Sequence, residues 1–150
     1  MVDANSTTIF FLRSNMKLTT YLKTKLEAWV PFEGFDGFEV KVAYLSREEL
    51  TKIRNSVTRV AFNPKTRQRE DNIDSELFVK EFVKAVVLDW KGLTLDIASK
   101  LLPLEVPADV DMAQEIEFSQ ESALDLSKNS PVFDGWLNDV TFDLERFRTR

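Results

Sequence analysis

The stretch PFEGFDGFEVKVAYLSREE, residues 31–49, is the most informative part of this sequence about its fold. The Gly-Phe-Asp-Gly sequence in its first half is typical of a turn. Apolar and polar side chains then alternate over residues 38–44, which predicts a half-buried strand. Residues 29–32 are expected to pair with this strand as a hairpin. Ser-Arg-Glu-Glu at 46–49 forms a capping box and predicts that a helix begins directly after the strand.

Most of the remaining chain has apolar residues at spacings of three and four, which predicts helices. The predicted helices cover residues 17–29, 46–61, 75–90, 94–102, 119–128 and 131–147. The helix at 75–90 is apolar around most of its circumference, so we expect it to be buried centrally.

Between these helices, residues 63–72 are predicted to be a charged loop, residues 104–118 are irregular, and residues 1–15 are predicted to be a flexible arm. The predicted fold class is therefore mainly α (α+β). It is one compact domain over residues 1–150, with five to six helices and a small N-terminal β hairpin.

Composition argues against most kinds of active site. The chain has neither cysteine nor histidine, which removes disulfides, thiolate ligands, cysteine nucleophiles and the commonest general base. Its four glycines are too scattered for a phosphate loop or a dinucleotide fingerprint. Asp139 and Asp143 form a carboxylate pair at helical spacing, which is typical of a solvated helix face. The acidic residues at 109–117 lack the central glycine of a calcium loop. We therefore expect a protein that is not an enzyme and has no metal or other cofactor.

The apolar runs bear on localisation. Residues 9–12 and 85–88 are both far shorter than the about 20 residues that span a membrane. The N-terminal sequence does not have the shape of a signal peptide. We therefore expect no membrane partner and a cytoplasmic location.

Charge is distributed unevenly along the chain. The net charge of −5 combines +4 in residues 1–70 with −9 in residues 71–150. Residues 101–127 contain seven acidic and no basic side chains, which suits either a solvated surface or contact with a basic protein. Six cations cluster near the loop at 63–72, but acidic neighbours and the acidic chain make nucleic-acid binding unlikely. The six cations are Lys52, Arg54, Arg59, Lys65, Arg67 and Arg69.

Seventeen aromatic residues are a generous number for 150 residues. Aromatic and aliphatic side chains at helical spacing are usually core, yet some could line a groove for a partner helix. The candidate partner-binding residues are Trp90, Leu93, Phe133, Trp136, Leu137 and Val140, and the competing interpretation places all six in the core.

The order of segments resembles the short tail assembly chaperones of long-tailed bacteriophages. The resemblance runs from about residue 32 to residue 147. It rests on four stretches in order: the strand leading into LSREEL at 45–50, the charged KTR at 65–67, the apolar helix ending in WKGLT at 90–94, and the FS cap at 118–119 followed by a closing helix with FD at 133–134.

The resemblance implies a protein that binds the tape measure protein and keeps it soluble until tail tube subunits assemble around it. The family implies a second partner, the tail tube protein, reached mainly through a frameshift-extended form. It also implies a location in the host cytoplasm and absence from the mature virion. Homo-oligomerisation is left open.

Two other functions are alternatives. One is a structural virion protein such as a tail completion or connector component. The other is a small nucleic-acid-binding regulator.

Overall fold

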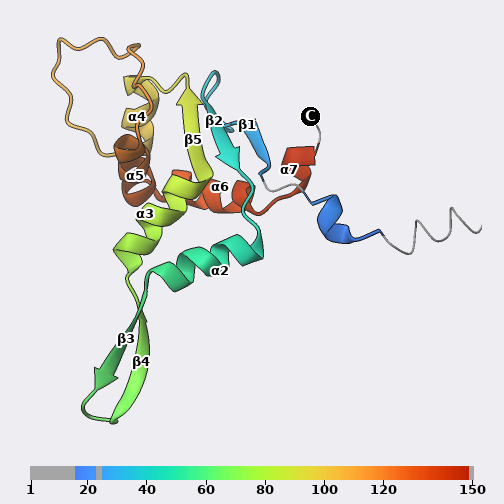
Figure 1. Cartoon of the computed structure of the whole chain (residues 1–150). Helices are drawn as coiled ribbons and strands as arrows, with labels where there is room; N and C mark the ends of the chain where they lie inside the picture. Colours follow the sequence, from blue (N-terminus) through green and yellow to red (C-terminus); the bar gives the residue numbers. More distant parts are fainter. Residues whose placement is uncertain (1–15, 23–24, 149–150) are drawn as a thin grey trace, which may run out of the picture.

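The computed structural model describes residues 16–22 and 25–148 (Figure 1). The flexible arm expected at residues 1–15 lies outside these ranges. Within them the chain forms a 3-10 turn η1, five strands and six α-helices. The elements are η1 (Leu18–Thr20), β1 (Glu27–Pro31), β2 (Glu39–Ala43), α2 (Arg47–Ser56), β3 (Thr58–Asn63), β4 (Gln68–Ile73), α3 (Ser75–Val86), β5 (Val87–Lys91), α4 (Leu95–Leu101), α5 (Gln120–Asn129), α6 (Pro131–Thr141) and α7 (Glu145–Arg148).

The prediction of a mainly helical fold with one small hairpin is wrong. The strands form two antiparallel sheets, a three-stranded sheet in the order β1-β2-β5 and a separate two-stranded sheet of β3 and β4. The predicted pairing of β1 with β2 is confirmed, with Val30 opposite Val40. The sequence interpretation missed the third strand of the first sheet and the whole second sheet. The fold is therefore an α+β mixture in which β2 is the central strand.

The helix predicted at residues 17–29 is wrong. Among the described residues of this stretch, 17–22 and 25–29, only η1 is helical. Leu18, Tyr21 and Leu22 are exposed, so their helical spacing has no core to face. From residue 26 onward the side chains alternate instead: Val30 and Phe32 are buried, and Trp29 and Pro31 are exposed. Pairing with β2 satisfies the backbone and buries this alternating face, which outweighs a local helical preference.

The helix predicted over residues 75–90 divides into two elements. Asp74 caps α3 as expected, accepting a hydrogen bond from the amide of Leu77 at 3.1 Å. The helix ends at Val86, and the chain continues without a loop as β5, where Trp90 pairs with Val40 of β2. The segment is apolar on all sides because it joins a helix with one buried face to a strand buried in the sheet. It is not one central helix.

A second correction concerns the helix that begins at Ser46. It stops at Ser56, five residues before its predicted end, and the residues that follow enter β3. The predicted loop at 63–72 is mostly strand β4, paired along its whole length with β3. Figure 1 shows the resulting hairpin, residues 58–73, projecting away from the rest of the molecule. The turn places Arg67 at φ 58°, and the Asn63 carbonyl accepts a hydrogen bond from the Arg67 amide at 2.7 Å.

The C-terminal helices follow their predicted caps. Ser119 accepts a hydrogen bond from the amide of Ser122, and Ser130 accepts one from the amide of Phe133. The helix predicted to reach residue 147 is interrupted after Thr141, because the chain turns so that α7 packs beside β1. Helices α3, α5 and α6 pack on one another, and α3 and α6 also contact β2. The core lies between these helices and the sheet.

Candidate protein-binding surfaces

Five of the six predicted partner-binding residues lie in the core. Trp90, Leu93, Phe133, Leu137 and Val140 are each at most 5% exposed. The remaining residue, Trp136, is half-buried. The structure therefore does not bring the six together as one open groove, and the competing interpretation as core describes five of them. The helical spacing of Phe133, Leu137 and Val140 on α6 is the spacing of a buried face.

Trp136 belongs to an aromatic cluster that joins α6 to the sheet. Its ring centroid is 4.9 Å from that of Phe32 and 5.8 Å from that of Phe133. Its indole nitrogen is buried and has no hydrogen-bond partner among the residues that the structure describes. The cluster stabilises the contact between α6 and the turn after β1 by burying aromatic area.

An open surface lies instead between α2, α3 and the ends of the sheet. We name it the α2–α3 groove. It is a cavity of about 470 Å³ with half-buried apolar side chains and a charged rim. The apolar side chains are Leu26, Tyr44, Ile53, Ala85 and Leu88, and the charged ones are Lys25, Glu27, Glu49, Lys52 and Lys84.

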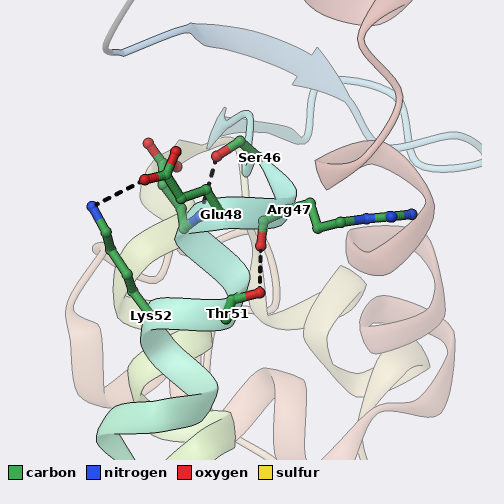
Figure 2. Close-up of polar contacts among 6 residues, drawn as sticks. Ser46, Arg47, Glu48, Thr51 and Lys52 are labelled. Atoms are coloured by element: carbon green, nitrogen blue, oxygen red, sulfur yellow. Dashed lines mark hydrogen bonds and ion pairs between the residues drawn. The ribbon is translucent and has the colours of Figure 1, made fainter.

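Helix α2 forms one wall of this groove and buries none of its residues. Local contacts hold its first turn (Figure 2). The Ser46 hydroxyl accepts a hydrogen bond from the Glu49 amide at 3.2 Å, and Lys52 pairs with Glu48 at 3.9 Å. The apolar positions Leu50 and Ile53 are only half-buried. Helix α2 is therefore held mainly by its cap and by surface ion pairs. Because its apolar stripe is incompletely covered, apolar area remains available to a partner.

The hairpin of residues 58–73 is a second candidate surface. Cross-strand partners point to the same face of a sheet, so the register places Val60, Phe62 and Ile73 together on one face. These three side chains are 63%, 64% and 48% exposed. The opposite face carries mainly polar side chains, including Arg59 and Asn72. The sequence interpretation missed this surface, although alternation through Thr58, Val60 and Phe62 is a strand signal.

A third surface lies where α4, α5 and the irregular segment 102–118 meet, and we name it the acidic-rimmed pocket. Its volume is about 200 Å³. Two predicted partner-binding residues, Trp90 and Leu93, contribute to its lining, together with the 41% exposed Leu104 and with Asp125. The indole nitrogen of Trp90 donates a hydrogen bond to the Ile116 carbonyl at 2.9 Å, which fixes the segment over the pocket.

Other kinds of site have little support in the described ranges. Residues 16–22 and 25–148 contain no group of three or more acidic side chains placed to hold a metal ion. In the same part of the chain, no helix is long and apolar enough to cross a membrane. Asp139 and Asp143 do not act as a pair, because Asp143 forms an ion pair with Arg146 at 3.3 Å.

No family model, curated protein or solved structure matches the chain.

Proposed function

We propose that this chain is a non-enzymatic tail assembly chaperone that binds the tape measure protein and keeps it soluble during tail morphogenesis. The observation that carries the proposal is the α2–α3 groove, together with the resemblance of residues 32–147 to short tail assembly chaperones. The groove has an apolar floor and a charged rim, which is the chemistry of sites that bind an amphipathic helix.

The proposed mode of action is masking. A long helical chain with exposed apolar stripes aggregates through those stripes, and a protein that covers them lowers the concentration of the aggregating species. In the groove, Ile53 of α2 and Leu88 of β5 would contact the apolar stripe, and Lys52 and Lys84 would face its polar flanks. Release would follow from competition by tail tube subunits, so it would need no nucleotide.

The test is co-expression of this chain with the tape measure protein encoded beside it. We expect the tape measure to become soluble and to co-purify with this chain. Replacing Ile53 by Arg should reduce the recovered tape measure at least about tenfold, because the charge is placed against the apolar stripe of the bound helix. The matched control is Val132→Asp, at a 63% exposed position of α6 that does not line the groove.

Three outcomes would count against the proposal in different ways. A tape measure that stays insoluble with the unaltered chain removes the chaperone function. A soluble complex that survives Ile53→Arg keeps the function but moves the binding site away from the groove. Recovery of this chain from purified virions would favour the structural alternative.

A further inference from the structure

The exposed hairpin carries an apolar face that no other segment within residues 16–22 and 25–148 covers. Phe62 and Val60 of β3 are 64% and 63% exposed, and both lie on the same face as Ile73 of β4. An isolated two-stranded hairpin is marginally stable in water. Covering this face with a partner would therefore stabilise the hairpin as well as remove apolar area from solvent.

The charge of the hairpin restricts the kind of partner. Residues 58–73 contain four cations, at Arg59, Lys65, Arg67 and Arg69, against two acids, so their net charge is +2. Arg69 lies directly opposite Phe62 and Asp71 lies directly opposite Val60, so the face carries one cation and one acid beside its apolar side chains. A complementary surface should combine an apolar depression with an acidic rim.

The acidic-rimmed pocket of the same protein is the candidate, with Asp125 as the one acid among its lining residues. Its lining is mostly apolar and includes Leu104 and Leu126. The stretch 101–127, which supplies much of the lining, carries seven exposed acids and no basic residue. The volume of about 200 Å³ is below the about 300–1,000 Å³ of small-molecule sites and suits one or two side chains of a docked protein.

Within one molecule the two surfaces cannot meet. Figure 1 shows the hairpin extending from one end of the molecule, and α4, α5 and the segment that joins them at the other end. We infer that the apolar face of the hairpin in one copy binds the acidic-rimmed pocket of a second copy, with Phe62 entering the pocket and Arg69 facing Asp125. This is a head-to-tail contact, and such contacts produce closed rings or open chains of copies.

Charge favours this arrangement over a symmetric pairing of two hairpins. Two hairpins would each bring a net +2 to the contact and repel one another, whereas the hairpin and the acidic rim attract. The pocket and the α2–α3 groove have different lining residues, so self-association and tape measure binding are separable.

The experiment uses two variants of the full chain, each blocking one half of the contact. The hairpin variant is Phe62→Glu with Arg69→Glu, and the pocket variant is Leu104→Lys with Asp125→Lys. All four positions are exposed, so both variants should keep the circular dichroism spectrum of the unaltered chain. Val132→Asp is again the control, because it lies in neither surface.

Light scattering and sedimentation velocity at low salt should show oligomers for the unaltered chain and for Val132→Asp, and monomers for each variant alone. An equal mixture of the two variants should form a one-to-one heterodimer, because the mixture retains one intact hairpin and one intact pocket. Raising the salt concentration to about 1 M should weaken self-association of the unaltered chain at least about tenfold, since the attraction is screened.

Four results would overturn the inference. They are a monomeric unaltered chain at concentrations up to about 1 mM, variants that still self-associate, a mixture that stays monomeric, and a hairpin that binds nucleic acid while the chain remains monomeric. Ile53→Arg should self-associate like the unaltered chain, so a failure of the proposed tape measure site leaves this test unaffected.

Discussion

Gly92 lies directly after β5 and has a φ of +77°, a conformation that disfavours side chains. A Cβ atom built on Gly92 would overlap the backbone carbonyl oxygen of Gly37 in the turn before β2. This close approach joins the end of β5 to the start of the central strand. The role of Gly92 in the structure is to let two backbones meet at the end of β5.

We predict that Gly92→Ala lowers the free energy of unfolding by about 2–4 kcal/mol, because strain from positive φ adds to a backbone clash. Gly34→Ala is the control. Gly34 also has a positive φ, of 91°, but nothing lies within 4 Å of its added Cβ, so only about 1 kcal/mol should be lost. Urea denaturation followed by circular dichroism measures both. Equal losses would mean that the contact with Gly37 is unimportant.

The residues of α6 allow a second comparison at this scale. Phe133 is fully buried among Phe32 and Trp136, whereas its neighbour Val132 is 63% exposed. Phe133→Ala should therefore lower the free energy of unfolding by about 3–5 kcal/mol, and Val132→Ala by less than about 0.5 kcal/mol. Thermal and urea melts provide the values. A small loss for Phe133→Ala would revive the interpretation of this residue as part of an exposed groove.

The hairpin of β3 and β4 is the element least integrated with the rest of the fold. Every residue of β4 is exposed, and β3 has no buried residue. Its base is closed by a hydrogen bond from the Asp74 amide to the Val57 carbonyl at 3.0 Å, and Val57 itself is buried. The part of the protein that folds cooperatively with α2 and α3 therefore extends to Val57 on one side of the hairpin and begins again at Asp74 on the other.

We expect that replacing residues 59–72 by a short glycine-serine linker leaves the rest of the molecule folded. Thr58 and Ile73 are already paired across the hairpin, so closing a short loop between them has a small entropic cost. The free energy of unfolding should change by no more than about 1 kcal/mol, measured in urea and supported by an unchanged near-ultraviolet spectrum of the tryptophans. Global unfolding of the deletion variant would contradict this account.

At the scale of the whole molecule, the buried residues are concentrated in the sheet β1-β2-β5 and in the helices that pack on it. The central strand β2 contacts β1, β5, α3 and α6, and its Val40 and Val42 are fully buried. The hairpin lies outside this network. Local stability should therefore differ strongly between the sheet β1-β2-β5 and the sheet β3-β4.

Native-state hydrogen exchange tests this difference directly. Amides of β2 should exchange at least about 100-fold more slowly than paired amides of β3 and β4 in the monomer, because only the former require opening of the core. If self-association covers the hairpin, its amides should become slower with increasing protein concentration while those of β2 do not. Uniform exchange across both sheets would show that the hairpin is part of the cooperative core.

The fold was predicted correctly where short-range chemistry decides it. Ser46, Asp74, Ser119 and Ser130 begin helices at the predicted residues, because a side-chain oxygen that accepts from an amide three residues later is a local interaction. Strand β2 was also predicted, since alternation over residues 38–44 has one interpretation. The wrong predictions concern the ends of helices, the apolar segments that follow them, and residues 17–29, where a helix was predicted and strand β1 begins at Glu27.

The candidate site was predicted less well. Helical spacing identified Phe133, Leu137 and Val140 as one face, but spacing does not distinguish a face that packs on the core from one that binds a partner. The α2–α3 groove joins residues from five separate elements, and its rim and floor are distant in sequence. Of the six predicted partner-binding residues, only Trp90 and Leu93 line one of the three open surfaces described above, the acidic-rimmed pocket.

The sequence by itself determined the turn at residues 34–37, the strand that follows it and the first residues of α2, α3, α5 and α6, because each of these depends on neighbours within a few positions. Tertiary structure decided that residues 87–91 form a strand: an apolar segment that favours a helix locally was taken up by the unpaired edge of β2, whose backbone groups need partners. It also decided that residues 58–73 extend from the molecule as a hairpin with an uncovered apolar face, because no element of the core lies within reach to cover it.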